Sequence, residues 1–209
     1  MNRTCFFLIT VLLFSSWAPI QPLTQLTKDE AREWTLRKEK DGIRVFTRPP
    51  LSGNLKDAKA ECLVENCSMS EILELAKDHE RYTQWMYRVT KTELVKQVNE
   101  TEFYIYAVFD TPWPFLDRDA VVHVKAEKMS GEYVSLVISL APEFYEESED
   151  MISISKLIAY WQIEKRDNDL FVSYEAAAAP GGWIPDWIAN LAATDLPFES
   201  LRLMKEELK

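Results

Sequence analysis

A series of strand-like segments, separated by short turns, constrains the fold more than any other feature of this sequence. Between residues 89 and 176, apolar residues recur at every second position, as at Phe103, Ile105 and Phe109. This is the period of a strand, in which successive side chains point to opposite faces. Short turns join antiparallel neighbours, because parallel strands need long crossovers. We therefore predict consecutive antiparallel strands at residues 89–98, 103–109, 120–127, 133–140, 152–163 and 170–176.

The first third of the chain predicts a hairpin, a further strand and a helix. The dipeptide Asp41–Gly42 separates two strand-like runs within residues 34–48, and it supplies the positive-φ residues of a tight hairpin. A third strand is expected at 55–64. The pattern Ser68–Glu71 is a capping box, which predicts a helix ending near His79, followed by a short helical turn at 82–86. A similar pattern at Thr27 predicts a helix to about residue 34.

Two irregularities are expected near the end of the sheet. The apolar positions change phase between residues 152–154 and 157–163, which predicts a bulge or break near Ser155–Lys156. The stretch AAAAPGGWIPDWIANLAA, residues 176–193, then stops a strand at Pro180–Gly181–Gly182.

A C-terminal helix follows, because Pro185 suits a first helical turn. Its apolar stripe is formed at helical spacing by Ile184, Trp187, Ile188 and Leu191. Pro197 predicts an interruption, with Asp195 capping a second helical segment. The fold class is α+β, with a curved antiparallel sheet packed against the last helix.

Charge and missing motifs exclude several functions. The net charge of −10 disfavours binding to nucleic acid, which needs a basic face. The sequence contains no HExxH, nucleophile-elbow, Walker or GxGxxG pattern. Aromatic residues are abundant, with seven tryptophans, and they suit either a large core or an apolar pocket. We expect no catalytic constellation, no metal site and no cofactor.

The N-terminus has the pattern of an export signal. One basic residue, Arg3, precedes an apolar run at 5–14 that is too short to span a membrane, and small residues follow it. We predict a signal peptide at 1–18, a tether at 19–27, a folded domain at 28–209, and a periplasmic or extracellular location. Whether the leader is cleaved, and whether Cys62 and Cys67 form a disulfide, stays open at this point.

The stretch TPWPFLDRD, residues 111–119, is the most unusual interior segment. Its two prolines stiffen the exit from one strand, and Trp113 and Phe115 are presented together. Asp117 and Asp119 flank Arg118. The residues alone favour a structural loop with a fixed ion pair.

Two motifs in this order resemble a known family. PWPFLDRDAVV, followed some 60 residues later by PGGWIPDWIAN, is similar to the START domain, the steroidogenic-acute-regulatory-protein-related lipid-transfer family. The hairpin DGIRVFTR and the strand at Trp161–Glu164 also fit, so the resemblance runs from about Thr27 to Lys209. It implies a helix-grip fold, in which a curved sheet wraps a long C-terminal helix around an apolar tunnel.

The resemblance also implies roles for particular residues. The Gly181–Gly182 pair becomes the hinge of a lid helix. The remaining lid and mouth residues are Trp113, Phe115, Trp183, Ile184, Trp187, Ile188 and Leu191. The aromatic residues expected to line the tunnel are Trp85, Tyr106, Phe109, Trp161 and Tyr174. Asp117, Arg118 and Asp119 form either a structural ion pair or a headgroup contact.

These features predict a protein that binds one lipid, fatty acid or sterol-like molecule, and they leave open whether it also transfers that molecule. We expect a monomer that touches membranes transiently and has no nucleic-acid partner. An enzyme of the helix-grip superfamily, a cyclase or hydrolase, is an alternative, and it would need a proton-moving group such as Tyr106, Arg118 or Asp119. A protein-interaction module with a filled core is a further alternative.

Overall fold

The computed structural model describes residues 32–51, 55–145 and 150–209, and the side chain of Leu191 is not among the described parts. The described strands form one sheet in the order β1-β2-β3-β10-β9-β7-β6-β5-β4, with the two-residue β8 pairing only with β6. All neighbours along this order are antiparallel. The expected helix at 27–34 begins outside the described residues, and Thr35 already belongs to a strand.

The strands agree closely with the alternation in the sequence. Their bounds are β1 (Thr35–Lys40), β2 (Ile43–Arg48), β3 (Asp57–Val64), β4 (Val89–Asn99), β5 (Glu102–Phe109), β6 (Arg118–Met129), β7 (Tyr133–Leu140), β8 (Ile152–Ser153), β9 (Lys156–Arg166) and β10 (Asp169–Ala179). The hairpin turn has φ of 54° at Asp41 and 72° at Gly42, as its sequence predicts. The predicted break falls between β8 and β9, at residues 154–155.

Two short helices and a 3-10 turn lie between β3 and β4. They are α2 (Met69–Lys77), η1 (His79–Arg81) and α3 (Tyr82–Trp85), and a further 3-10 turn, η2 (Pro142–Phe144), follows β7. The capping box of α2 is present, because Ser68 N–H donates to Glu71 over 2.8 Å and Glu71 N–H donates to the Ser68 hydroxyl. The sequence-predicted start of this helix is thereby confirmed.

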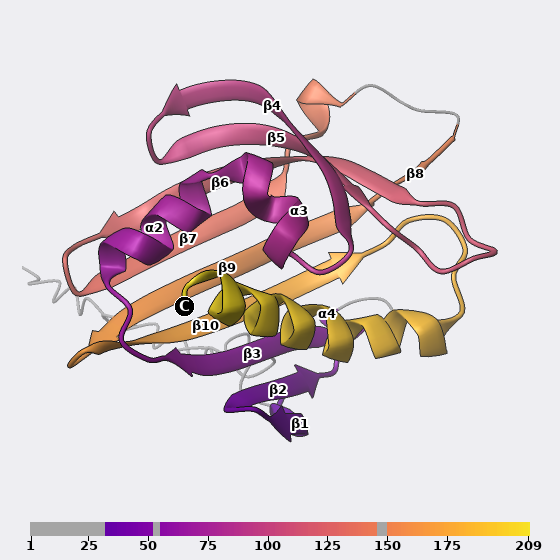
Figure 1. Ribbon diagram of the computed structural model, residues 1–209. Coiled ribbons are helices and arrows are strands. Elements are labelled where there is room, and N and C mark those ends of the chain that lie inside the picture. The colour runs from indigo at the N-terminus through magenta and orange to yellow at the C-terminus, as the bar shows by residue number, and fades with distance from the viewer. Residues whose placement is uncertain (1–31, 52–54, 146–149) are drawn as a thin grey trace, which may run out of the picture. The chain divides into compact units, whose positions relative to one another are not determined.

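The long helix α4 (Asp186–Glu207) lies across one face of the curved sheet (Figure 1). It contacts β2, β3 and α3. Its C-terminal half is anchored in the core by Phe198, Leu201 and Met204, which are all buried. This arrangement of sheet and helix is the helix-grip fold expected from the sequence. Among the described residues, no helix combines the length and the apolar character needed to cross a bilayer.

Pro197 was expected to divide this helix, and that expectation is wrong. The helix continues without interruption from Asp186 to Glu207 with Pro197 inside it. A proline removes one N–H, so the carbonyl of residue 193 lacks its usual intrahelical donor. Ala193 and Pro197 both line the cavity described below. The buried residues that follow hold the second half of the helix in line, and tertiary packing overrides the local preference.

The core lies between α4 and the inner face of the sheet, and it includes α2 and α3. Its most deeply buried side chains include Ile43, Val45, Leu170, Val172 and Leu201. Cys62 and Cys67 are buried and free, so the described structure contains no disulfide between them.

Candidate functional site

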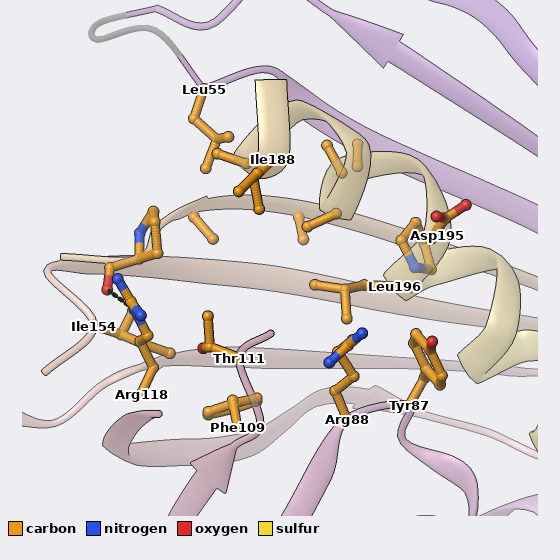
Figure 2. A pocket seen from close by; sticks show the side chains of 18 of the residues that line it. Leu55, Tyr87, Arg88, Phe109, Thr111, Arg118, Ile154, Ile188, Asp195 and Leu196 are labelled. Atoms are coloured by element: carbon orange, nitrogen blue, oxygen red, sulfur yellow. Dashed lines mark hydrogen bonds between the residues drawn. The ribbon is translucent and has the colours of Figure 1, made fainter. Parts of the chain in front are cut away.

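A cavity of about 290 Å³ lies under the N-terminal half of α4. One wall is built by β10, whose residues Tyr174, Ala176 and Ala178 follow one another at every second position, and Pro180 lines the cavity directly after the strand. Strand alternation points the three β10 side chains to the same face. Figure 2 shows helix α4 above the space and the ends of other strands below it.

Small side chains leave this space open. On the helix, Ala189, Ala192 and Ala193 face the cavity together with Ile188, and Ile184 lines it just before the helix begins. On the sheet, Ala58, Ala176 and Ala178 do the same. A leucine or phenylalanine at any of these positions would extend into the space, so the alanine-rich sequence on both walls accounts for the cavity. Other apolar lining residues are Leu55, Phe109, Pro112, Ile154, Leu157, Leu196 and Pro197.

An aromatic pair closes the inner end of the cavity. The ring of Tyr174 lies 4.6 Å from the ring of Trp161, centroid to centroid. Trp161 and Trp85 line a separate cavity of only about 30 Å³ on the other side. Burial raises the pKa of Tyr174 to about 12, so its hydroxyl is protonated at neutral pH. Because Tyr174 lines the larger cavity and Trp161 lines the smaller one, these two rings separate the cavities.

The predicted tunnel residues take three different positions. Phe109 and Tyr174 line the larger cavity. Trp85 and Trp161 pack edge-to-face in the core, with centroids 5.8 Å apart, and border the smaller cavity. Tyr106 lies outside both cavities, and its hydroxyl donates to Asp119 over 3.0 Å. Whether any of the five contacts a ligand stays a prediction.

Arg118 lines the larger cavity at the end where β10 stops and the predicted lid segment begins. Only 3% of the residue is exposed. Its Nη1 donates to the carbonyl of Leu116, and its Nε donates to the carbonyl of Pro180 over 3.4 Å. The third nitrogen, Nη2, is buried and has no hydrogen-bond partner in the described part of the chain.

The expected ion pair between Arg118 and its flanking aspartates is absent. Asp119 is fully buried and accepts hydrogen bonds from Tyr106 and from Tyr145, the latter over 2.9 Å. Asp117 accepts the backbone N–H of Thr111 over 2.9 Å. Alternation along β6 explains this result, because Arg118 and Asp119 point to opposite faces of the sheet. Burial lowers the pKa of Arg118, and the charge of Asp117 partly offsets that effect.

The lid residues divide between the cavity and the surface. Ile184 and Ile188 face inward. Trp183 and Trp187 point outward and are 77% and 70% exposed, and Trp113 from the β5–β6 loop is 91% exposed. Phe115 links the two segments, with its ring 6.1 Å from that of Trp183. The role predicted for Leu191 concerns a side chain outside the described parts.

Backbone conformation at the lid hinge requires glycine. Gly181 has φ of +70°, and a Cβ added to it would lie 2.0 Å from the carbonyl oxygen of Ser153. At Gly182, with φ of +57°, a Cβ would meet the side chain of Ile152 at 2.9 Å. The chain can therefore pass β8 this closely only without side chains at these two positions.

Sequence reasoning missed the charged residues around the cavity. Lys56, Arg88 and Asp195 line it, as does Asp110, which forms an ion pair with Arg88. Arg88 has φ of 66°, a conformation that its sequence does not reveal. Figure 2 shows Arg88 and Arg118 reaching up from the same side of the cavity. Among the described residues, no three His, Cys, Asp or Glu side chains are grouped as metal ligands would be.

A curved antiparallel sheet that holds a C-terminal helix over an apolar cavity defines a helix-grip protein with an internal site for a hydrophobic guest. Comparison with known proteins identifies the family. The START domain model matches residues 20–202. The chain belongs to the START domain family.

Three similar proteins illustrate the range of the family. An uncharacterized protein of Pseudomonas aeruginosa is 27% identical over 173 residues, which cover 82% of this chain and 85% of that protein. Phosphatidylcholine transfer protein of Mus musculus is 25% identical over 168 residues, covering 77% of each chain. The crystal structure of a STAR-related lipid transfer protein from Xanthomonas axonopodis is 27% identical, with a TM-score of 0.77, covering 84% of this chain and 98% of that one.

Proposed function

We propose that this protein binds one lipid-like molecule in the cavity beneath α4 and carries it between membranes. The cavity itself is the observation that carries this proposal. It lies between the sheet and α4, and aliphatic side chains dominate its walls. Membership of the START family and similarity to lipid transfer proteins support the same function.

Burial of apolar surface is sufficient to retain such a guest. Each Å² of apolar surface removed from water contributes about 25 cal/mol. Association entropy and the ordering of the guest subtract several kcal/mol from this gain. Ligand sites usually measure about 300–1,000 Å³, and this cavity of about 290 Å³ lies just below that range. A slender molecule therefore fits better than a bulky one.

The mouth of the cavity carries a surface suited to a lipid bilayer. Trp113, Trp183 and Trp187 are all mostly exposed, and Leu116 beside Trp113 is half exposed. Tryptophan is enriched at membrane interfaces, where its ring reaches the acyl boundary and its N–H meets the headgroups. We propose that these side chains rest on a membrane while the lid opens. The net charge of −10 argues that aromatic insertion drives this contact rather than electrostatic attraction.

We propose a carrier rather than an enzyme. A cyclase or hydrolase would need a proton-moving group within reach of the guest. The Tyr106 hydroxyl and the Asp119 carboxylate bind each other outside the cavity. Arg118 lines the cavity, but a guanidinium does not release its proton in proteins. Among the groups named for the enzymatic alternative, none can therefore move a proton inside this cavity.

A matched pair of substitutions on β10 tests the proposal. Ala176 faces the cavity, and Ala177 points to the opposite face of the same strand. Ala176→Phe should fill the space and abolish transfer of fluorescent fatty acid and phospholipid between vesicles, whereas Ala177→Phe should leave transfer intact. Mass spectrometry should also find an intact lipid on unmodified protein purified from its native cells. Equal transfer by both variants would refute the assignment of this cavity.

Export and a monomeric state are proposed on the sequence alone. The apolar run at 5–14 and the small residues after it support export. The mass of the protein recovered from the periplasm or the medium of its native cells, measured together with its size in solution, tests both. Recovery only from the cytoplasm with the leader intact would count against export.

A further inference from the structure

The guanidinium of Arg118 is buried beside the cavity. A buried cation is normally matched by a carboxylate or by a full set of hydrogen bonds. Among the described residues Arg118 has neither, because two of its nitrogens donate to backbone carbonyls and Nη2 has no acceptor. No ion pair of Arg118 is present within the described residues. A charged donor left in this state costs free energy that an acceptor of opposite charge would recover.

The other aspartates near the cavity are already engaged. Asp119 accepts from two tyrosines on the opposite face of β6, and Asp117 accepts the N–H of Thr111. Asp110 pairs with Arg88, and Asp195 lies 3.5 Å from the ammonium of Lys38. Arg118 therefore differs from Arg88, the other arginine lining the cavity, whose charge is matched by a carboxylate.

We infer that the natural guest carries an anionic oxygen headgroup, and that Arg118 binds it at the mouth of the cavity. The specific ligand class is a single acyl chain ending in a carboxylate. This inference rests on the proposed function and adds the chemical class of the guest. A charge-assisted hydrogen bond from Nη2 to the carboxylate would satisfy the one unmatched nitrogen.

The shape of the cavity agrees with one head and one chain. The lining runs along β10 from Tyr174 to Pro180 just after the strand, seven residues or about 20 Å of extended chain. Arg118 lies at the Pro180 end of this line, and the pair of Tyr174 and Trp161 lies at the other. The walls are mostly aliphatic, with three alanines on α4 and two on β10. With about 290 Å³ available, the space suits a single chain better than a two-chain phospholipid.

Arg118 also connects the guest to the lid. Its Nε donates to the carbonyl of Pro180, the residue directly before the Gly181–Gly182 hinge, and its Nη1 donates to Leu116 in the loop that carries Trp113. An anion bound to Nη2 would hold this side chain in place, and with it both segments that border the mouth. Headgroup binding and lid closure are therefore expected to favour each other.

The test compares two probes that differ only in charge, cis-parinaric acid and its methyl ester. Fluorescence titration of the unmodified protein should show at least tenfold tighter binding of the acid, equivalent to about 1.4 kcal/mol. Equal affinity would overturn the anionic headgroup while leaving hydrophobic binding in place. Tighter binding of the ester would overturn it as well. If neither probe binds and no lipid co-purifies, both this inference and the proposed function fail.

Two variants then test whether Arg118 causes the preference for the acid over the ester. Arg118→Gln should abolish the preference for the acid and leave the affinity for the ester within twofold. The control is Arg44→Gln, which removes an exposed arginine that pairs with Glu61 on β3, away from the cavity. It should keep the full preference. A retained preference in a folded Arg118→Gln protein would overturn the role of Arg118, and circular dichroism checks the folding. If that variant does not fold, the comparison of the two probes on unmodified protein still decides the headgroup.

Lysophosphatidic acid and lysophosphatidylcholine distinguish a carboxylate headgroup from a phosphate headgroup. Both present one acyl chain and a phosphate, but the choline cation cancels the charge of the second. Binding of the acyl carboxylate at least as tightly as either supports the assigned class. Stronger binding of lysophosphatidic acid by tenfold or more would overturn the carboxylate in favour of a phosphate.

Discussion

Replacement of Gly181 by alanine tests the proposal that the segment after Gly181–Gly182 acts as a lid over the cavity. The added Cβ would lie 2.0 Å from the carbonyl oxygen of Ser153, and that oxygen belongs to the backbone of β8, which cannot rotate aside. The residue would also keep φ of +70°, which costs an L-residue about 1–2 kcal/mol before any clash is counted. The closed lid should therefore lose at least this much free energy relative to the open lid.

This loss of free energy predicts faster release of the guest. A loss of 1–2 kcal/mol shifts an equilibrium by a factor of about 5–30. If the lid must open before a guest leaves, release of bound parinaric acid into excess vesicles should accelerate by a similar factor. Hydrogen exchange of amides in residues 183–190 should rise in parallel, because the N-terminal half of α4 would detach more often. The C-terminal half, anchored by Leu201 and Met204, should keep its protection.

The matched control is Gly131→Ala. This glycine lies in the turn between β6 and β7, and a Cβ added there meets no atom within 4 Å. The Gly131→Ala protein should release the probe at the rate of the unmodified protein. If Gly181→Ala also releases at that rate, and its exchange at 183–190 is unchanged, closure does not depend on the approach of Gly181 to Ser153. The hinge assignment would then be refuted.

Three further predictions concern the surface, the core and the response to pH. Trp187→Ala should reduce binding to phosphatidylcholine vesicles several-fold and change the free energy of unfolding by less than about 0.5 kcal/mol, because the ring is 70% exposed. An equal loss of stability would assign Trp187 to the core. Leu201→Ala should destabilise the fold by about 2–5 kcal/mol in urea titration, because Leu201 is completely buried; a change below 1 kcal/mol would contradict the packing. Burial raises the pKa of Cys62 from 9.0 to about 12, and that of Tyr174 from 10.0 to about 12. In the folded protein both groups stay protonated and neutral. Their contribution to the free energy of unfolding is therefore complete below pH 9 and is lost as the pH rises toward 12. Urea midpoints that stay constant from pH 8 to 11.5 would oppose this.

Local sequence signals predicted most of the fold, because each has a local cause. Asp41–Gly42 fixes a hairpin through two positive φ angles, and Ser68 with Glu71 fixes the start of α2 through two reciprocal hydrogen bonds. The break before β9 follows from the change in apolar phase at Ser155. These signals need no knowledge of distant residues, which is why they could be interpreted from the sequence.

Signals that depend on distant packing were harder to interpret. Pro197 favours a helix break locally, yet buried residues beyond it keep α4 continuous. The sequence predicted one apolar stripe formed by Ile184, Trp187, Ile188 and Leu191. Within α4, however, Trp187 is exposed and Ile188 lines the cavity, because consecutive helical positions lie about 100° apart around the axis. Ile184 also lines the cavity, but it precedes the first residue of α4.

The candidate site is defined by small side chains and by one unmatched charge, and both features could have been predicted from alternation. Ala176 and Ala178 share the face of β10 that looks toward α4, so the alanine run predicts an unfilled space wherever the helix also presents alanine. In the same way, a period of two places Asp119 on the opposite face from Arg118, so the DRD sequence argues against the ion pair that its composition suggests. Large aromatic residues suggest a lipid site in the sequence, yet Trp85 and Trp161 pack against each other in the core. Small side chains leave room for a guest in this protein. Arg118 is buried without a carboxylate partner among the described residues, and we propose that it sets the polarity of the guest.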